Sequence, residues 1–338
     1  MTDVKIEAEN LKTHFAVDDD LLSRLLSRGE GKKVKAVDGV SLQIHEGESF
    51  GLAGESGCGK TTLGKTLLRL QEPAAGKIYF DGEDITEKSN NELYSFRQNA
   101  QIIHQDPYTS LNPQFKVKEW VQEPLKVHNV GSKPEQLDKV RKTLEQVGLR
   151  PAGAYMNEYP SELSGGERQR VGIARAIVLD PSFIVSDEPV SMLDVSIRAG
   201  IIELLQDLKE DIGLSALYIS HDLSLLKHIC DRIGIMYLGK LVEVGPANQI
   251  INDPKHPYTK ALVSSTPIID PDTERDPVEL TGEVPDPINL PPGCRFAPRC
   301  PEVMDECTQD EPPMYDTGEG RETRCILYDE EIETPQQL

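Results

Sequence analysis

The sequence predicts an α/β protein built around a parallel sheet, with a mostly helical insertion between residues 90 and 163 and a small cysteine-bearing tail. Two short apolar runs, at residues 183–186 and 217–220, have the composition of strands buried on both faces. A helical pattern separates these runs, and strands that alternate with helices build parallel sheets. The length of 338 residues is enough for one large domain or two ordinary ones.

The first elements follow in order from the N-terminus. Residues 4–15 are predicted to form a strand. The charged residues 18–35 are interpreted as a solvated loop, in preference to a short amphipathic helix around the two leucine pairs of this segment. Residues 49–53 are predicted to form a short buried strand, which a glycine-rich turn joins to a helix over residues 61–70.

Helical periodicity marks two later segments. Ser132 and Glu135 have capping-box spacing, and apolar residues recur after them at steps of three and four: Leu137, Val140, Leu144 and Val147. A second helix can end at Gly213, and its apolar face comprises Ile201, Leu204, Leu205, Leu208 and Ile212. Residues 233–238 and 241–244 are then predicted to form a hairpin.

The composition shifts after about Asn252, where prolines break any regular element: Pro267, Pro271, Pro277, Pro285, Pro287, Pro291 and Pro292. We interpret this stretch as a linker or an extended wrap that leads to a small tail with four cysteines. The predicted domains are therefore residues 1–252 and residues 253–338.

The acidic composition excludes several classes of function. The 36 Lys and Arg against 57 Asp and Glu give a formal charge of −21, which argues against binding nucleic acid or anionic lipid through a basic face. No apolar run approaches the roughly 18–20 residues that span a bilayer. The N-terminal residues also lack the basic and apolar regions of a secretion signal. We therefore expect a soluble cytosolic chain that reaches a membrane only through a partner.

The charge of −21 has two interpretations, and the sequence leaves both open. One is an ordinary acidic cytosolic protein. The other is adaptation to a salt-rich cytosol, where screening removes the self-repulsion that this charge imposes in dilute buffer. Only the second interpretation expects thermal stability to rise up to multimolar KCl.

Residues 54–61 satisfy the phosphate-loop pattern and lie between a predicted strand and a predicted helix. Glycines let the backbone curl so that its amides converge on phosphate oxygens, and the following helix adds its positive dipole end. Lys60 would reach the β- and γ-phosphates, and the Thr61 hydroxyl would bind Mg²⁺. The residues expected to contact a nucleoside triphosphate here are Gly54, Ser56, Gly57, Cys58, Gly59, Lys60, Thr61 and Thr62.

Two carboxylates follow the apolar run at residues 183–186. Asp187 is placed to hold Mg²⁺ through its water shell, and Glu188 could polarise the attacking water as a general base. His221 follows the second apolar run, so it is expected at the same sheet edge, beside the γ-phosphate. Alone, such a carboxylate pair is more often a solvated strand end, and a lone histidine is more often structural. The phosphate loop is what favours the functional interpretation.

Residues 163–170 open a further amphipathic helix. Ser164, Gly165 and Gly166 expose a hydroxyl and amides at the N-terminus of this helix, which makes a second anion site. A chain that binds one ATP needs no second phosphate site of its own. The economical explanation is that this site completes the nucleotide site of a neighbouring chain across a dimer interface.

With these motifs in this order, nearly the whole chain resembles the nucleotide-binding subunits of ATP-binding cassette (ABC) transporters. The resemblance implies a mixed sheet core with N-terminal antiparallel strands, a helical subdomain at about residues 90–165 and a C-terminal extension. Residues 54–62 resemble the Walker A loop, 102–107 the Q-loop, and 163–167 the family signature. The Walker B pair, the D-loop aspartate and the switch histidine are then Asp187 with Glu188, Asp194, and His221.

The resemblance also implies roles for single residues. Gln105 would touch Mg²⁺ and the attacking water, and would couple the site to a membrane partner. Phe15 is in the neighbourhood of the aromatic residue that stacks on adenine. Glu167 stands where many importers have glutamine, and Met192 where alanine is usual, but neither change removes a group that contacts phosphate.

Three further motifs, at residues 104–113, 188–191 and 256–262, resemble those of oligopeptide, dipeptide and nickel importers. The N-terminal insertion and the Gly-Cys-Gly of the loop are similar to the second of the two ATPase subunits that such importers pair. The resemblance implies a second ATPase subunit (a heterodimer, or alternatively a homodimer) and two permeases at the cytoplasmic face of the membrane. An extracellular binding protein would deliver the solute, which is a peptide or a related solute such as nickel or a sugar.

Four of the six cysteines crowd into the tail: Cys294, Cys300, Cys307 and Cys325. A cytosol keeps thiols reduced, so a bound metal is favoured over disulfides. The spacing lacks the Cys-x2-Cys pairs of most zinc ribbons. Residues 293–301 resemble a segment in which some importer ATPases carry a [4Fe–4S] cluster. We expect iron–sulfur first, structural Zn²⁺ second and free thiols third.

Two rival functions are weaker. A soluble ABC ATPase that acts on DNA or ribosomes shares the signature, but the charge of −21 and the importer-like tail argue against it. A plain phosphate-loop kinase leaves the signature helix unexplained. The sequence therefore predicts the ATP-hydrolysing subunit of an importer, with no nucleic-acid partner.

Overall fold

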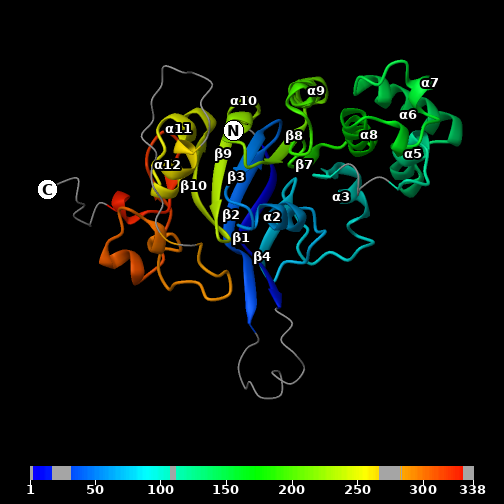
Figure 1. Cartoon of the computed structure of the whole chain (residues 1–338). Coiled ribbons are helices and arrows are strands. Elements are labelled where there is room, and N and C mark those ends of the chain that lie inside the picture. The colour runs from blue at the N-terminus through cyan, green and yellow to red at the C-terminus, as the bar shows by residue number, and fades with distance from the viewer. Residues whose placement is uncertain (1–2, 17–31, 107–111, 266–281, 283, 330–338) are drawn as a thin grey trace, which may run out of the picture. The chain divides into compact units, whose positions relative to one another are not determined.

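The computed structural model describes residues 3–16, 32–106, 112–265, 282 and 284–329 (Figure 1). Most of the loop predicted over residues 18–35 lies outside these residues, as do residues 107–111 of one importer motif and the prolines between 266 and 281. The chain divides into two compact units. The first comprises Met1–Glu7, Gln43–Ser49 and Tyr79–Ile219, and the second comprises Ala8–Leu42, Phe50–Ile78 and Ser220–Leu338.

Three parallel strands form the sheet of the first unit: β6 (Ala100–Ile103), β7 (Phe183–Asp187) and β8 (Ser215–Ile219). Every residue of β7 and β8 is buried, which explains why these strands are continuous apolar runs. The α/β prediction is therefore confirmed. Strand β6 corrects the expectation of helix throughout residues 90–163, because this four-residue strand with two half-buried positions is too short to show a period.

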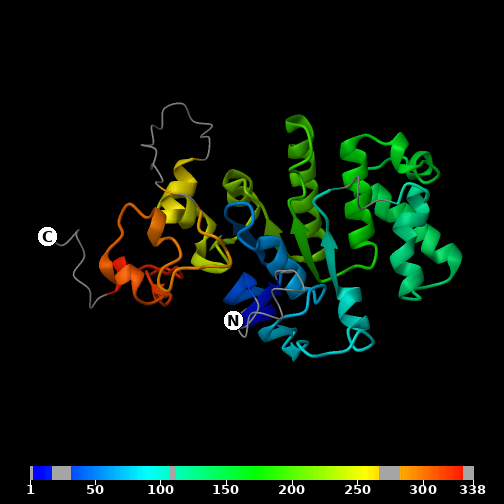
Figure 2. The ribbon, with the colours of Figure 1, turned by 60° about the horizontal axis from the view of Figure 1, so that its bottom comes forward.

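The first unit also contains most of the longer helices of the chain. Its helices are α3 (Tyr94–Asn99), α5 (Val117–Val127), α6 (Lys133–Gln146), α7 (Ala152–Tyr155), α8 (Gly165–Ile177) and α9 (Val195–Ile212). Helices α5, α6 and α8 pack against one another (Figures 1 and 2). The capping box before α6 is confirmed, since the Ser132 N–H donates to Glu135 Oε2 at 2.7 Å. Helix α9 ends at Gly213, whose φ of +64° is left-handed.

The second unit contains a sheet that the tail extends. Strand β3 (Ser49–Ala53) pairs in parallel with β9 (Arg232–Tyr237), which forms the predicted hairpin with β10 (Lys240–Pro246). Two short tail strands, β11 (Tyr315–Asp316) and β12 (Glu322–Thr323), continue the sheet, with β12 antiparallel to β10. The tail that follows the proline-rich stretch therefore forms the edge of this sheet.

A four-stranded sheet has the order β2-β1-β4-β5, which confirms the predicted N-terminal antiparallel strands. Its strands are β1 (Val4–Ala16), β2 (Lys33–His45), β4 (Ala75–Phe80) and β5 (Glu83–Asp84). The strand predicted over residues 4–15 is therefore confirmed as β1.

The helices of the second unit are short: α2 (Lys60–Leu67), α10 (Leu223–Ile229), α11 (Ala247–Asn252) and α12 (Pro257–Ser264). Three 3-10 turns follow in the tail, at Ala297–Arg299, Asp305–Thr308 and Ile326–Tyr328. In its described part, the tail has a small apolar cluster made of Ala297, Cys307 and Ile326, with Cys294 and Met304 packed against it. No helix in the described part of the chain is long and apolar enough to cross a membrane.

The buried His256 provides a pH test of this packing. Its Nδ1 accepts the Tyr258 N–H at 3.0 Å at the start of α12, and burial lowers the pKa of His256 to about 3. Below pH 6.5 the unfolded chain takes up a proton that the folded chain refuses, so stability is full above pH 6.5 and falls toward pH 3. The loss is about 1.4 kcal/mol per pH unit.

The His256→Asn variant keeps a good N-cap and removes the titration. Between pH 6.5 and 5.5, where the unfolded histidine is only partly protonated at the start, we expect the free energy of unfolding in urea to fall by about 1 kcal/mol more in the wild type than in the variant. Other acid-sensitive groups, including Glu243, are common to both proteins. Identical pH dependence in the two proteins would contradict a neutral buried His256.

Candidate functional site

The glycine-rich turn of the second unit lies between β3 and α2, as predicted. Gly54 has a φ of +149°, and a Cβ there would lie 2.1 Å from the Met236 carbonyl oxygen. Gly59 has a φ of +108°, and a Cβ there would lie 1.9 Å from the Ala36 carbonyl oxygen. Both positions therefore require glycine for its backbone conformation and for its lack of a side chain.

Lys60 begins α2 and reaches back across the loop. Its Nζ donates to the Gly54 carbonyl at 2.7 Å and to the Glu55 carbonyl at 2.9 Å, and only 6% of the residue is exposed. Burial raises the pKa of the Cys58 thiol against the opposing charge of Lys60, so this thiol is neutral. The arrangement places one ammonium and the N-terminus of α2 at a curled loop, which suits an anion.

The first unit brings Gln105 and Glu188 together across 83 positions of the chain. Gln105 Nε2 donates to Glu188 Oε2 at 2.8 Å. The Glu188 N–H donates to the Ile219 carbonyl at 2.9 Å, which ties this residue to the end of β8. Glu188 has a φ of +46°, a left-handed conformation that is uncommon for a residue with a side chain and typical of functional sites. The buried Asp187 directly precedes it.

The turn after Glu188 leads into α9. The Ser191 hydroxyl and the Ser191 N–H both donate to the Glu188 carbonyl, at 3.1 and 3.2 Å. Asp194 lies just before α9 with an exposed side chain, and its carbonyl accepts the Ile197 N–H at 2.9 Å. The backbone of this turn is therefore closed on itself by hydrogen bonds.

Ser164 caps α8 as the sequence suggests. The Ser164 hydroxyl accepts the Glu167 N–H at 3.4 Å, and Glu167 Oε2 accepts the Ser164 N–H at 2.8 Å. The Ser164 hydroxyl also donates to Glu167 Oε2 at 2.6 Å, and the two bonds from Ser164 to this carboxylate hold the pKa of Glu167 below its usual range. Either glutamate or glutamine can close a capping box, so Glu167 is compatible with this helix start. A Cβ at Gly166 would lie 2.7 Å from Ile197 Cγ2, which explains the small residue there.

The remaining predicted residues lie in separate places. His221 belongs to the second unit, directly before Asp222, whose carboxylate caps α10 by accepting the Ser224 N–H at 3.0 Å. Phe15, near the end of β1, is 38% exposed. The phosphate loop belongs to the second unit, whereas Gln105 and Glu188 belong to the first. The roles expected for Phe15, His221 and Asp194 stay predictions.

Two residues of the C-terminal region contact the phosphate loop and were not predicted to do so. The Tyr258 hydroxyl accepts the Glu55 N–H at 2.8 Å, and the Arg299 guanidinium pairs with both Glu55 carboxylate oxygens. Both residues lie in segments whose motifs resemble those of importer ATPases, at residues 256–262 and 293–301. That resemblance was the available signal, but it gave no partner for either side chain.

The tail cysteines do not form a recognisable metal site. Among the described residues, no group of three or more His, Cys, Asp or Glu side chains is placed to hold a metal ion. The Cys294 N–H donates to the Cys307 carbonyl at 2.8 Å, and all four thiols are free. Burial raises the pKa of Cys300 and of Cys325 to about 12. The predicted cluster ligands Cys294, Cys300, Cys307 and Cys325 are therefore not confirmed.

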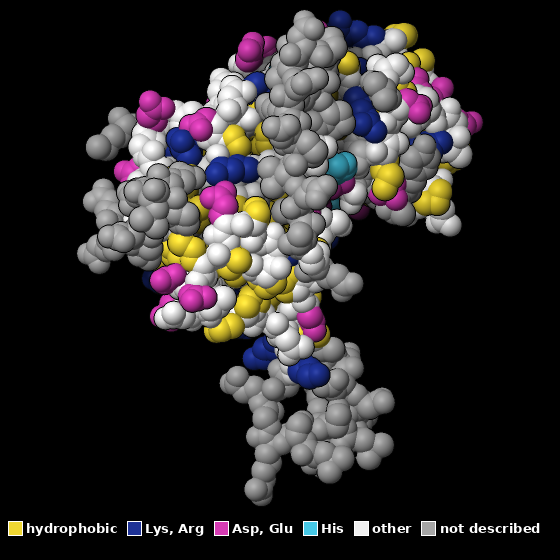
Figure 3. All heavy atoms as spheres, turned by 60° about the vertical axis from the view of Figure 1, so that its left-hand side comes forward, with side chains coloured by type: hydrophobic (Ala, Val, Ile, Leu, Met, Phe, Trp, Pro, Cys, Tyr) yellow, Lys and Arg dark blue, Asp and Glu magenta, His cyan; other side chains and the backbone are white. Residues whose placement is uncertain are grey.

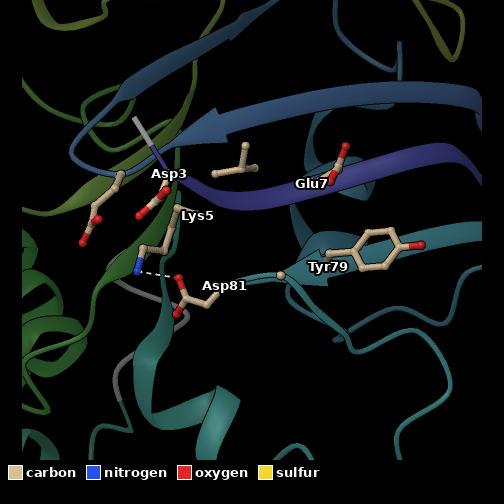
Figure 4. A pocket seen from close by; sticks show the side chains of 8 residues that line it. Asp3, Lys5, Glu7, Tyr79 and Asp81 are labelled. Carbon is tan, nitrogen blue, oxygen red and sulfur yellow. Dashed lines mark ion pairs between the residues drawn. The ribbon is translucent and has the colours of Figure 1, made fainter. Parts of the chain in front are cut away.

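A cavity of about 500 Å³ lies in the first unit. Its lining comprises Asp3, Val4, Lys5, Glu7, Glu46, Tyr79, Asp81 and Gly82. The Lys5 ammonium is 2.7 Å from Asp81 Oδ1, and Figure 4 shows this ion pair beside Asp3. Carboxylates dominate this lining, so the cavity does not suit a phosphate ligand.

Comparisons with known families agree with the motifs. The family described as "ABC transporter" matches residues 37–191, and the family described as "Oligopeptide/dipeptide transporter, C-terminal region" matches residues 242–307. The two matches together span the phosphate loop, the signature and part of the cysteine tail.

Similar proteins cover almost the whole chain. The putative oligopeptide transport ATP-binding protein YkfD of Bacillus subtilis (strain 168) is 47% identical, over 96% of this chain and 95% of the relative. The dipeptide transport ATP-binding protein DppF of Escherichia coli (strain K12) is 42% identical, over 98% and 96%. The dimeric post-hydrolysis structure of the ATP-binding cassette MJ0796 bound to ADP and Pi has a TM-score of 0.62 at 26% identity, over 72% of this chain and 98% of that one. This likeness confirms the predicted fold.

Some glycines of the phosphate loop lie against another backbone and others do not, and substitution by alanine distinguishes the two cases. Gly59→Ala combines a left-handed backbone with a clash against the Ala36 carbonyl, so we expect the free energy of unfolding to fall by about 3 kcal/mol or more. Gly57→Ala is the matched control, because φ is +79° but nothing lies within 4 Å of the added Cβ. Its expected cost in urea unfolding is about 1 kcal/mol. Equal losses would show that the close approach is unimportant.

Proposed function

Because the chain belongs to the ABC-transporter family of oligopeptide and dipeptide transport ATP-binding proteins, we propose that it hydrolyses ATP to power the import of peptides, or of a related solute such as nickel or a sugar. The observation that carries the chemistry is the 2.8 Å hydrogen bond from Gln105 to Glu188. It fixes the direction of a carboxylate that directly follows the buried Asp187.

In this proposal each of the predicted site residues has a part in hydrolysis. Lys60 and the amides of the phosphate loop bind the β- and γ-phosphates of ATP. Glu188 accepts a proton from the water that attacks the γ-phosphorus, and ADP leaves as the bond to its β-phosphate oxygen breaks. Thr61, Asp187 and Gln105 would hold Mg²⁺, which neutralises charge on the phosphates when bound. His221 would contact the γ-phosphate, and Phe15 would stack on adenine.

The signature helix supports the involvement of a second ATPase subunit. Ser164, Gly165 and Gly166 begin α8, where helix amides attract anions, and Asp194 begins α9. We propose that they complete the nucleotide site of a second ATPase subunit. The structure of the similar cassette MJ0796 with ADP and Pi is described as dimeric. A heterodimer is preferred here and a homodimer is the alternative.

The ATPase pair would act through other proteins. Two permeases at the cytoplasmic face of the membrane would hold it there as a peripheral subunit, and an extracellular binding protein would deliver the solute. The relatives bear transport names, so they offer no support for the alternative of an ATPase acting on DNA or ribosomes. Acidic side chains are scattered over the face shown in Figure 3, beside Lys and Arg. Adaptation to a salt-rich cytosol stays a prediction.

The tail thiols remain a proposed metal-binding set. Supporting this, four cysteines occur within 32 residues, and the apolar cluster described in the tail is small. Thiolates can bind either an iron–sulfur cluster or Zn²⁺. Any such group would act as a staple or a redox centre, separate from the hydrolysis of ATP.

A measurement of metal content distinguishes an iron–sulfur cluster, a structural Zn²⁺ and free thiols in the tail. After anaerobic purification at high salt, we expect about four irons and four sulfides per chain and a visible absorption band. Cys300→Ser should abolish both, while the matched Cys230→Ser, at a buried cysteine outside the tail, should keep them. One zinc per chain would replace the cluster by a structural site. Absence of any metal would contradict the metal proposal and leave four free thiols.

Glu188→Gln tests the catalytic assignment. The variant keeps the hydrogen-bonding shape of the side chain but loses the base, so we expect ATP binding to persist and turnover to fall by about a hundredfold or more. Glu203→Gln, at an exposed position on α9, is the control and should hydrolyse ATP normally. Near-normal turnover by Glu188→Gln would refute its role as general base.

A further inference from the structure

Glu55 of the phosphate loop is held at three points. Its N–H donates to the Tyr258 hydroxyl at 2.8 Å, and its carbonyl accepts from Lys60 Nζ at 2.9 Å. Its carboxylate pairs with Arg299, from Nη1 to Oε2 at 2.9 Å and from Nη2 to Oε1 at 3.1 Å. Two of these three points belong to the C-terminal region, although Arg299 is 244 positions away along the chain.

The two C-terminal residues are themselves firmly supported. Tyr258 packs against Tyr237 and Phe296, with ring centroids 4.6 and 5.4 Å apart, and its N–H is bonded to His256. Arg299 donates to the Tyr237 hydroxyl at 3.3 Å, and its guanidinium carbon lies 5.9 Å from the centre of that ring. Only 9% of the Arg299 side chain is exposed. Because these contacts hold Arg299 in place, its bidentate pair with Glu55 has a defined geometry and leaves the Glu55 side chain little conformational freedom.

The charge of Glu55 makes this contact matter for nucleotide binding. A carboxylate in a loop that binds a triphosphate opposes the ligand, because like charges repel across a partly buried site. The side chain of Glu55 is 30% exposed, so water screens it only in part. Arg299 offsets its charge at hydrogen-bonding distance. Removing one partner of such a pair leaves the other charge uncompensated.

We propose that Arg299 is a positioning residue for ATP binding: together with Tyr258 it fixes Glu55 and neutralises its carboxylate, so that the affinity of the phosphate loop for ATP depends on the cysteine-bearing C-terminal region. This inference rests on the proposed function, since it requires that the loop bind ATP. It assigns the contact between the tail and the loop a function in nucleotide binding, in addition to its contribution to stability.

The test measures the dissociation constant of MgATP for the full-length chain by titration calorimetry. We expect Arg299→Gln to weaken binding about tenfold and Arg299→Lys, which keeps the charge but not the bidentate geometry, about threefold. Glu55→Gln removes the repelling carboxylate itself, so it should bind MgATP more tightly than Arg299→Gln does. The double variant Glu55→Gln with Arg299→Gln should bind within about twofold of Glu55→Gln, because no carboxylate remains to be neutralised.

Salt and a second variant separate charge from hydrogen bonding. The loss in Arg299→Gln should shrink between 0.1 M and 1 M KCl, at which the screening length falls from about 10 Å to about 3 Å. Tyr258→Phe removes the acceptor of the Glu55 N–H but no charge. It should weaken binding by a smaller factor that salt does not change.

Arg321→Gln is the control for general damage to the tail. Arg321 is also a buried arginine of this region, and it pairs with Asp253 at 3.3 Å, outside the phosphate loop. The control should lose thermal stability and keep the wild-type affinity for ATP. The proposal is overturned if Arg299→Gln binds ATP like the wild type, if Glu55→Gln does not rescue it, or if Arg321→Gln weakens binding equally. A wild-type chain that does not bind MgATP at all would instead refute the proposed function.

Discussion

The close approach of the phosphate-loop backbone to neighbouring strands is the constraint on which the second unit depends. Gly54 lies against the Met236 carbonyl of β9, and Gly59 lies against the Ala36 carbonyl of β2. The Gly239 N–H also donates to the Cys58 carbonyl at 2.9 Å. The curl of the loop therefore depends on its close contacts with both strands, and a phosphate site arises from packing as much as from its own sequence.

The same hairpin that supports the loop also anchors the tail. Leu238, in the turn between β9 and β10, accepts a hydrogen bond from Arg295, which also pairs with Asp38. Despite the cost of its burial, this pairing and neighbouring charges hold the pKa of Asp38 below its usual value. Buried arginines are tolerated only with partners, so the tail can dock only where the hairpin and β2 present these acceptors.

The sequence was sufficient wherever the signal is local. The apolar runs of β7 and β8, the capping box before α6 and the glycine pattern at residues 54–61 each lie within a short window, and each is confirmed. Strand β6 escaped prediction because four residues cannot show a period. The left-handed backbone conformation of Glu188 was not predicted, because it arises from the turn around this residue and not from the residue type.

Contacts between distant residues were beyond the reach of sequence patterns. Gln105 and Glu188 were each expected in the site, but their hydrogen bond is a property of the folded sheet. Arg299 and Glu55 were never expected to meet, because a charge pair between two loops has no spacing rule. The pairing of β12 with β10 was missed for the same reason, since a two-residue strand carries no alternation.

These distant contacts make the C-terminal region depend on the rest of the second unit for its order. Its own apolar cluster of Ala297, Cys307 and Ile326 is too small to order a segment of this length. Most of its support comes from other elements of the second unit: β12 on β10, Arg295 on Asp38, and Arg299 on Glu55. A segment stabilised in this way is held close to the phosphate loop, because several of the contacts that order it lie at the hairpin or at the loop itself. The boundary predicted near residue 252 separates two sequence compositions, whereas strand pairing and ion pairs join the residues on its two sides.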